Sequence, residues 1–429
     1  MPPQPLVSLR PGTLILLAVC HFAAFVDRSL SAVFAPSLKQ AFGLSDTQIG
    51  ALQGPAFVAV FAIATLLTGT RHNRLGVRSL LVGCLLLWTL ASLAFALSAS
   101  YEALLASRLL LGLGQAAFAP TALRLLTQGV PAPQLGRATS VFTAGSATGR
   151  SGALLIGGLI LAILTQFPAA AGDEPWRLAI VAMVVPNLIL VALLLRQIRG
   201  TDVPPLPQAG LGRALARIAR HPLGLGLHIL AASGIILMVQ AAAGWVPSIF
   251  NRSIGLSPAD SALLAGAVVL VAAPIGHVGA GWLLDRHLAR GGGPGVLMVA
   301  GAAGAVAGAS ILAVAQQPIG AVAGLTLITA GGGAAALVAL AAIHPLSPPT
   351  LKGSMVSLYL AIVAVLGSAL GPLLTGVVSD RLFPHATGLS LSLVTVIGTA
   401  GLVVTASALA GHSAWMRLAQ ATRTEAAAP

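Results

Sequence analysis

Two charged side chains stand next to each other in the first apolar run of the sequence. Asp27 and Arg28 lie near the middle of LAVCHFAAFVDRSLSAVFAP, residues 17–36, in which nearly every other side chain is apolar. A charged side chain at the centre of a bilayer costs about 2.5–3.5 kcal/mol on insertion scales, so it persists only where it faces a cavity or a partner. Adjacent helix positions point about 100° apart, so the two residues need not pair with each other.

Two more arginines, Arg108 and Arg150, interrupt later apolar runs of the same half of the sequence. Three cations then stand against one acid, Asp27, and this excess of positive charge predicts a bound carboxylate, sulfonate or phosphate. The guanidinium suits that role because its planar donors match the oxygens of such anions. For each arginine a second interpretation stays open, in which it donates to backbone carbonyls where helices pack. Gln115 lies seven residues after Arg108, on the same helix face, and is expected either to line the cavity or to join helices.

Asp27 is the residue expected to carry a proton. Desolvation favours the protonated form of a buried carboxyl, whereas neighbouring guanidinium groups favour the ionised form. The balance of the two can place its protonation equilibrium close to neutral pH. An anion bound to Arg28 would cancel the arginine's charge and thereby favour the protonated acid. The anion and the proton would each promote binding of the other, which predicts proton-coupled symport driven by the proton gradient and without a cofactor.

The elements that must position these residues are membrane-spanning helices. The 429 residues are 57% hydrophobic and 8% charged, with a mean hydropathy of +0.94, whereas soluble domains carry about 25% charged residues. A span needs about 20 mostly apolar residues. Twelve windows fit: 13–37, 47–70, 79–98, 102–128, 138–165, 177–196, 222–246, 259–284, 295–315, 319–343, 354–378 and 388–410. The sequence therefore predicts an all-α membrane protein with twelve transmembrane helices.

The basic residues predict how the chain is oriented. Of the 23 Lys and Arg, three lie deep within spans. The others lie near or beyond the ends of spans, sixteen on one side of the membrane and four on the other. The basic side is cytoplasmic by the positive-inside rule, so both termini are expected there. The net charge of +13 is thus explained by orientation and contact with anionic lipid, and no nucleic-acid partner is expected. The Ala-, Gly- and Arg-rich composition is typical of a high-GC bacterium and predicts the inner membrane. A monomer is expected because one twelve-span chain can enclose a pathway.

A polar break divides the spans into two sets of six. It predicts an N-terminal bundle over 1–200, a basic cytoplasmic linker over 201–221, and a C-terminal bundle over 222–429 with a short cytoplasmic tail. A loop repeats between the halves, GTRHNRLGVR at 69–78 and GWLLDRHLAR at 281–290, each after the second span of its half. Repeated halves are typical of secondary transporters with a binding site between two pseudo-symmetric bundles.

These loops resemble the signature loop of the major facilitator superfamily, Gly-x-x-x-Asp-Arg-x-Gly-Arg followed by Arg or Lys. Gly69, Arg74, Gly76 and Arg78 match it, Asn73 replaces the Asp, and the second copy keeps Asp285 and Arg286. The resemblance implies alternating access, in which these loops gate the two bundles. It also implies that Asp285 faces the start of the fifth helix, where Arg137 is a possible ion-pair partner.

The first span and GPLLTGVVSD, residues 371–380, are similar to two branches of that superfamily. One is the anion:cation symporter branch, which takes up organic acids, and the other is the spinster-like branch, associated with lysolipids. Gln115 stands where both branches usually have Glu. In the C-terminal half, His277 and Tyr359 are the polar side chains assigned to substrate binding.

Uptake of a small organic anion is the function that the sequence favours. The alternatives are an exporter of a lysolipid or drug-like amphiphile and, more remotely, a receptor that kept the transporter fold. An enzyme is not expected, because the sequence holds no Gly-x-Ser-x-Gly elbow, Walker loop or zinc-ligand spacing. For the same reason no metal site is expected.

Overall fold

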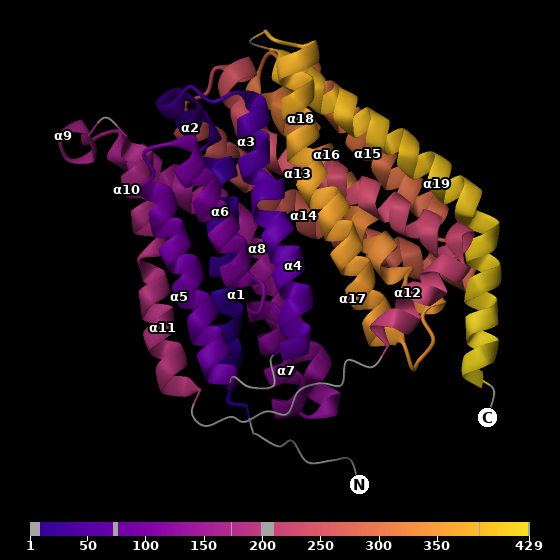
Figure 1. Ribbon diagram of the computed structural model, residues 1–429. Helices are drawn as coiled ribbons and strands as arrows, with labels where there is room; N and C mark the ends of the chain where they lie inside the picture. Colours follow the sequence, from indigo (N-terminus) through magenta and orange to yellow (C-terminus); the bar gives the residue numbers. More distant parts are fainter. Residues whose placement is uncertain (1–8, 72–75, 173, 199–209, 386, 428–429) are drawn as a thin grey trace. The chain divides into compact units, whose positions relative to one another are not determined.

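The computed structural model describes residues 9–71, 76–172, 174–198, 210–385 and 387–427. Within these ranges the regular structure is helical, and twelve stretches are long and apolar enough to cross a membrane. The predicted all-α fold with twelve spans is confirmed. Because most adjacent spans are joined by short connections, successive spans within each half of the chain run in opposite directions (Figure 1).

The described part of the chain up to residue 198 contains eleven helices, because several spans are interrupted and two short helices lie between spans. These are α1 (Pro11–Val33), α2 (Ala35–Phe42), α3 (Asp46–Gln53), α4 (Pro55–Arg71), α5 (Val77–Ala96), α6 (Tyr101–Gln115), α7 (Phe118–Gly129), α8 (Ala132–Leu164), α9 (Pro168–Ala171), α10 (Pro175–Val184) and α11 (Pro186–Gln197).

Proline explains two of the interruptions. Pro55 separates α3 from α4, and Pro186 separates α10 from α11. Proline has no N–H to donate, so the helical hydrogen-bond pattern is interrupted at both points. Gly54, before Pro55, also leaves helical geometry, whereas Val185, before Pro186, keeps it. The second break matters for the site, because it makes Asn187 part of the first turn of α11.

The remaining helices follow the linker. They are α12 (Leu211–Arg220), α13 (Leu227–Ile254) after one π-turn at Pro222–Gly226, α14 (Pro258–Ala289), α15 (Gly295–Val314), α16 (Pro318–Ala341), α17 (Lys352–Val363), α18 (Ala369–Leu382) after a second π-turn at Ala364–Ser368, and α19 (Gly388–Ala427). The last helix is longer than its predicted span, 388–410, because its final residues are mostly good helix formers without proline.

Contacts divide the chain into two compact units. The first comprises Met1–Leu44, Ala56–Pro207 and Ser257–Gly266, and the second comprises Ser45–Pro55, Gln208–Leu256 and Ala267–Pro429. The short helix α3 therefore belongs to the second unit, although it precedes α4 in the sequence. The division predicted from the sequence, into a bundle over 1–200, a linker over 201–221 and a bundle over 222–429, stays a prediction.

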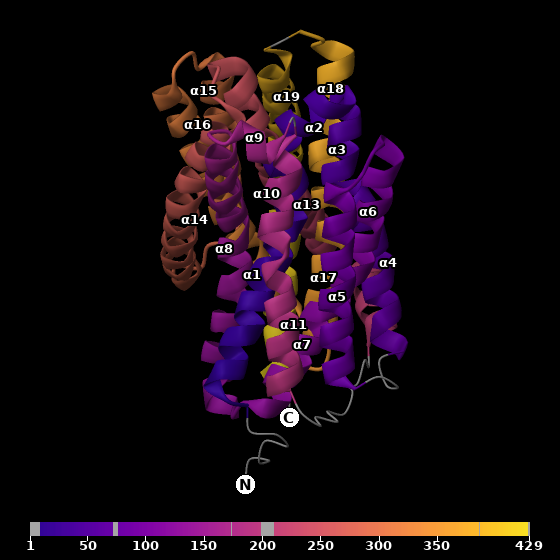
Figure 2. The ribbon, with the colours of Figure 1, turned by 90° about the vertical axis from the view of Figure 1, so that its left-hand side faces the viewer.

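In the first unit, α1 packs along α8 and also touches α11 (Figure 2). Three glycines of α8 allow the close approach. A Cβ at Gly149 would lie 2.6 Å from Cβ of Phe25 and 2.8 Å from the carbonyl oxygen of Phe22, and Gly145 and Gly152 face α1 in the same way. Small residues at helix contacts let backbones approach in a bilayer. This packing brings Arg150, the residue after Gly149, beside the helix that carries Arg28.

In the second unit, α13, α15, α16 and α19 pack on one another, and α3 packs on α18. Glycine again sets the distances. A Cβ at Gly308 would lie 2.5 Å from the carbonyl oxygen of Gly324 on the neighbouring helix, and one at Gly50 would lie 2.5 Å from that of Pro372. The α3–α18 contact therefore depends on the GPLLTGVVSD stretch.

Candidate functional site

The candidate site is a cluster of charged and amide side chains inside the first unit. Its residues come from four helices: Asp27 and Arg28 from α1, Arg108 and Gln115 from α6, Arg150 from α8, and Asn187 from α11. Asp27, Arg108, Gln115 and Asn187 are buried, whereas Arg28 and Arg150 are partly exposed. The structure thus brings together the five residues of the first half that the sequence assigned to anion and proton binding.

Arg28 is the cation with donors to spare. One terminal nitrogen, Nη2, donates to Oε1 of Gln115 at 3.2 Å, while the buried Nε has no hydrogen-bond partner in the described chain. Aromatic rings surround the guanidinium, with centroids 4.6 Å (Phe25), 4.3 Å (Phe57) and 5.1 Å (Phe61) from Cζ. A buried donor without a partner costs free energy, so an oxyanion placed here would satisfy a group that the protein leaves unsatisfied.

Arg108 joins α6 to the backbone of α1. Its Nη1 donates to the carbonyl oxygen of Asp27 at 3.3 Å, and its Nη2 donates to that of Arg28 at 2.8 Å. From the sequence, Arg108 is expected either to bind an anion or to donate to backbone carbonyls. These two bonds are of the second kind. They fix the stretch of α1 that presents Asp27 and Arg28.

Gln115 reaches the same stretch of α1 one turn earlier. Its Nε2 donates to the carbonyl oxygen of Ala24 at 2.8 Å, and its Oε1 accepts from Arg28. Gln115 and Arg108 both contact α1, as their seven-residue spacing predicts. The amide therefore both joins helices and holds the Arg28 guanidinium, so the two roles considered from the sequence coexist.

Asp27 has a partner that the sequence analysis missed. Nδ2 of Asn187 donates to Oδ2 of Asp27 at 2.8 Å, and both side chains are almost fully buried. The sequence carries a signal for Asn187, because it is the single amide in the apolar run PNLILVALLL. Only the packing of α11 on α1 shows which side chain it meets.

Positive charge concentrates at this cluster. Arg28 lies close enough to Arg108 and Arg150 for their positive charges to repel its own. Asp27 is the acid that attracts Arg108. The arrangement can hold an anion against Arg28 while Asp27, one residue away on the same helix, gains or loses a proton.

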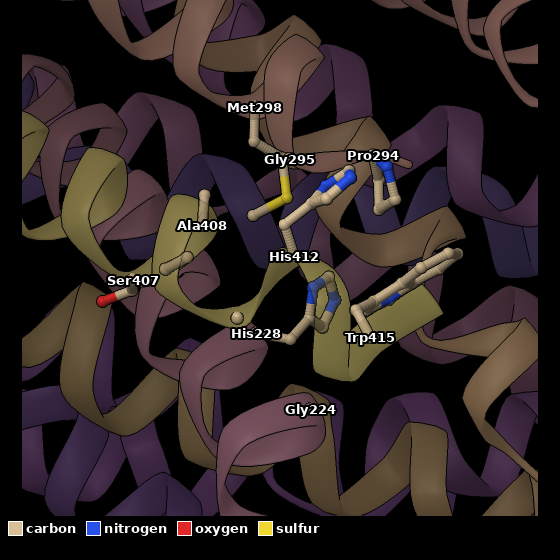
Figure 3. A pocket seen from close by; sticks show the side chains of 11 residues that line it. Gly224, His228, Pro294, Gly295, Met298, Ser407, Ala408, His412 and Trp415 are labelled. Atoms are coloured by element: carbon tan, nitrogen blue, oxygen red, sulfur yellow. The ribbon is translucent and has the colours of Figure 1, made fainter. Parts of the chain in front are cut away.

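The second unit places its candidates differently. His277 is exposed; its Nδ1 hydrogen bonds to the carbonyl oxygen of Ala273 at 2.7 Å. Tyr359 is buried, with its ring centroid 6.0 Å from that of His228. His228 in turn lines a cavity of about 20 Å³ together with Met298, His412 and Trp415 (Figure 3). A cavity of that size holds about one water molecule, which makes it too small for an organic anion.

Most of the proposed gating residues are described. Gly69 lies in α4, Gly76 directly precedes α5, and Asn73 and Arg74 lie outside the described residues. Nη2 of Arg78 donates to the carbonyl oxygen of Leu195 at 2.8 Å, which ties α5 to α11.

In the second copy of the loop, Asp285 is exposed, and Cζ of Arg286 lies 3.4 Å from the ring centroid of Trp282. Arg137 is exposed in the first unit, and Asp285 belongs to the second. Their pairing stays a prediction.

A further polar cluster lies in the second unit, where α3 begins and α13 and α18 end. Both terminal nitrogens of Arg252 donate to Asp46 at 2.8 Å, and Oγ of Ser379 donates to the same carboxylate at 2.7 Å. Asp380 accepts from the backbone N–H groups of Asp46 (3.1 Å) and Thr47 (2.7 Å). A carboxylate at a helix N-terminus satisfies free N–H groups and interacts favourably with the helix dipole. Ser379 and Asp380 end the GPLLTGVVSD stretch, so that motif has a structural role.

Metal ligands do not cluster in the part of the chain that the structure describes: no group of three His, Cys, Asp or Glu side chains there could hold an ion.

Comparisons with known proteins find relatives that match two thirds or more of the chain. Protein spinster homolog 1 of Homo sapiens is 26% identical over 417 residues, which cover 88% of this chain and 75% of the relative. The probable sulfoacetate transporter SauU of Cupriavidus necator is 25% identical over 301 residues, 67% of each chain. The crystal structure of a bacterial homolog of the human lysosomal transporter spinster superposes with a TM-score of 0.80 at 19% identity, covering 97% of this chain and 99% of that one.

The sequence model of the Major Facilitator Superfamily matches residues 17–372. That range runs from the first span to the GPLLTGVVSD stretch of the eleventh, and so includes every residue of the charged cluster. The relatives and the fold are those of transporters, not enzymes. The chain is a twelve-span membrane transporter and belongs to the major facilitator superfamily.

Proposed function

We propose that this transporter moves a small organic anion across the membrane together with a proton. The observation that carries the proposal is Arg28, a partly exposed guanidinium whose buried Nε has no hydrogen-bond partner in the described chain. A carboxylate or sulfonate oxygen can take that N–H, and charge-assisted bonds of this kind are about twice as strong as neutral ones. The likeness to a probable sulfoacetate transporter supports a substrate of this class.

The rings around Arg28 support an anion with an apolar or aromatic body. The rings of Phe25, Phe57 and Phe61 line part of the surroundings of the guanidinium with carbon. A substrate whose head binds Arg28 would place its remaining atoms against these rings. Binding sites for small molecules are commonly built in this way, from apolar walls and a few polar groups that fix orientation.

Coupling to protons would run through Asp27. A bound anion lowers the net positive charge next to Asp27, which favours the protonated carboxyl. Release of the anion on the other side would restore that charge and favour loss of the proton. Arg108 and Asn187 act as positioning residues in this scheme, because they hold the α1 backbone and the carboxylate respectively. Uptake across the inner membrane with both termini cytoplasmic is part of the proposal.

The first test is a thermal-shift screen of the purified protein against carboxylates, sulfonates, sugar acids and lysophospholipids. A ligand that binds only the folded state raises the melting temperature. We expect a small-anion hit that is lost in Arg28→Ala, weakened in Arg28→Lys, and retained in Arg196→Ala, which removes an exposed arginine of the same unit. Equal stabilisation of Arg28→Ala would refute the assignment of Arg28.

The second test uses vesicles with an imposed pH gradient. Asp27→Asn should abolish accumulation driven by the gradient while leaving exchange of the anion across the membrane intact. Persistence of accumulation in this variant would rule out Asp27 as the proton carrier without affecting the anion assignment.

Export of an amphiphile is the second candidate function. The feature that favours it is an apolar groove of about 350 Å³ in the second unit, lined by α13, α18 and α19 residues such as Leu237, Leu374 and Val403. If only lysophospholipids or apolar drugs stabilise the protein in the screen, this candidate replaces the anion proposal.

A further inference from the structure

The linker between the two halves contains a short helix, α12, with a sharply divided surface. Leu211, Leu215 and Ala219 recur every four residues along one side, whereas Arg213, Arg217 and Arg220 recur at intervals of four and three along another. At about 100° per residue, these two rows lie on opposite sides of the helix. Division of leucine from arginine in this way is typical of helices that lie in a membrane interface.

One side of α12 attaches it to the rest of the second unit. Ala214 is buried, Nη2 of Arg217 donates to Oγ1 of Thr422 at 2.9 Å, and the same nitrogen lies 3.5 Å from Oε2 of Glu425. Both partners belong to α19, and α12 also contacts the beginning of α17. The helix is therefore held beside the ends of two spans (Figure 1).

The remaining sides of α12 are open. Leu211 is 42% and Leu215 is 56% exposed, and Arg213 and Arg220 are exposed as well. Three more exposed cations stand on the neighbouring helix ends, at Lys352 of α17 and at Arg417 and Arg423 of α19. We call these five cations, Arg213, Arg220, Lys352, Arg417 and Arg423, the basic collar. Exposed leucines next to a basic collar match the apolar and anionic layers of a phospholipid surface.

We propose that α12 lies in the headgroup layer of the membrane, with Leu211 and Leu215 among the acyl chains and the basic collar bound to anionic phospholipid headgroups. The position follows from α17, which contacts α12 and begins at Lys352, next to the start of the predicted span 354–378. The charge of the collar selects anionic over zwitterionic lipid, and each surface cation adds about fivefold to such binding. The inference is independent of the transported substrate.

The test uses the full chain in vesicles of phosphatidylcholine alone or with one quarter phosphatidylglycerol. An environment-sensitive fluorophore on Leu215→Cys reports the depth of α12, and native mass spectrometry counts bound phosphatidylglycerol. We expect blue-shifted emission that is quenched by spin-labelled lipid, and a loss of roughly twenty-five-fold in phosphatidylglycerol affinity for Arg213→Gln/Arg220→Gln. The control, Arg196→Gln/Arg290→Gln, removes two exposed arginines from other helix ends and should retain most of that affinity.

Three outcomes would overturn the proposal. Emission typical of water with no quenching would place α12 in solvent, and this readout needs no charge variant to fold. Equal affinity loss in the two double variants would show that any exposed arginine serves, so that α12 has no special part. A blue shift that appears in detergent and rises with protein concentration would mean that the leucines contact a second copy of the chain.

Discussion

At the scale of single residues, the hydrogen bond from Asn187 to Asp27 is the contact that most directly controls the proposed proton site. Asn187→Ala removes a donor that favours the ionised carboxylate. Loss of a hydrogen bond to a charged group costs about 1.5–3 kcal/mol, so we expect the alkaline limb of pH-dependent uptake to move by about one unit or more toward higher pH. Asn187→Ser, which can still donate, should restore part of the shift. A lower maximal rate with an unmoved pH profile would assign Asn187 a purely structural role.

Gln115 gives a second prediction at this scale, because its Oε1 accepts from Arg28. Gln115→Glu places a titratable group against the guanidinium. When the new carboxyl is ionised it competes with the substrate anion for Arg28, and when it is protonated it does not. Anion binding should therefore weaken as pH rises in Gln115→Glu, more steeply than in the native chain. Titrations by thermal shift at several pH values measure this, and Gln115→Leu serves as the uncharged control. Parallel pH dependence in all three proteins would contradict the prediction.

At the scale of elements, the α1–α8 contact depends on glycine. A Cβ at Gly149 would lie 2.6 Å from Cβ of Phe25, whereas one at Gly136 of the same helix would meet nothing within 4 Å. Crowding a packed contact costs about 1–3 kcal/mol, and replacing a helical glycine in open space with alanine stabilises by about 0.5–1 kcal/mol. Gly149→Ala should lower the melting temperature and Gly136→Ala should leave it unchanged or raise it. Equal melting temperatures would mean that α1 shifts freely along α8.

The docking of α3 on α13 and α18 is a second property of elements, because residues from all three helices meet at Asp46. The bidentate pair with Arg252 is mostly shielded from solvent, and removing one partner of a buried pair costs about 3–5 kcal/mol. Asp46→Asn should lower the melting temperature clearly more than Asp260→Asn, which alters an exposed carboxylate that accepts a hydrogen bond from Oγ of Ser257. The double variant Asp46→Asn/Arg252→Gln should recover part of the loss, since no unpaired charge remains.

At the scale of the whole molecule, the distribution of Lys and Arg predicts the orientation in the membrane. In the topology predicted from the sequence, sixteen basic residues fall on the side assigned to the termini and four on the other. Single cysteines at exposed Arg213 and Arg381 of a Cys20→Ala/Cys84→Ala background should react with a membrane-impermeant thiol reagent from opposite sides of the inner membrane. Arg381→Cys is expected to label in intact cells, and Arg213→Cys only after the membrane is opened. The reverse labelling pattern would show that the chain has the opposite orientation in the membrane.

The sequence by itself determined the number of spans and the family, and it singled out five of the six residues of the charged cluster. It could do so because a bilayer demands long apolar runs, and because a charge inside such a run stands out in one dimension. The predicted windows match the twelve spans to within about five residues at each end, with two exceptions. The seventh span continues to Ile254 instead of ending at 246, and α19 continues to Ala427. The sequence also showed that Asp27 and Arg28 need not pair.

Only the tertiary structure decided which partner each charged residue has. Asn187, Phe57 and the carbonyls that bind Arg108 are 29 to 160 positions away from the residues they contact, and nothing local in the sequence fixes such distances. The same holds for Asp46, whose partners Arg252 and Ser379 come from helices far along the chain. Hydropathy acts on each helix separately, whereas these contacts depend on the rotation and depth of several helices at once, which the packing of glycines and prolines sets.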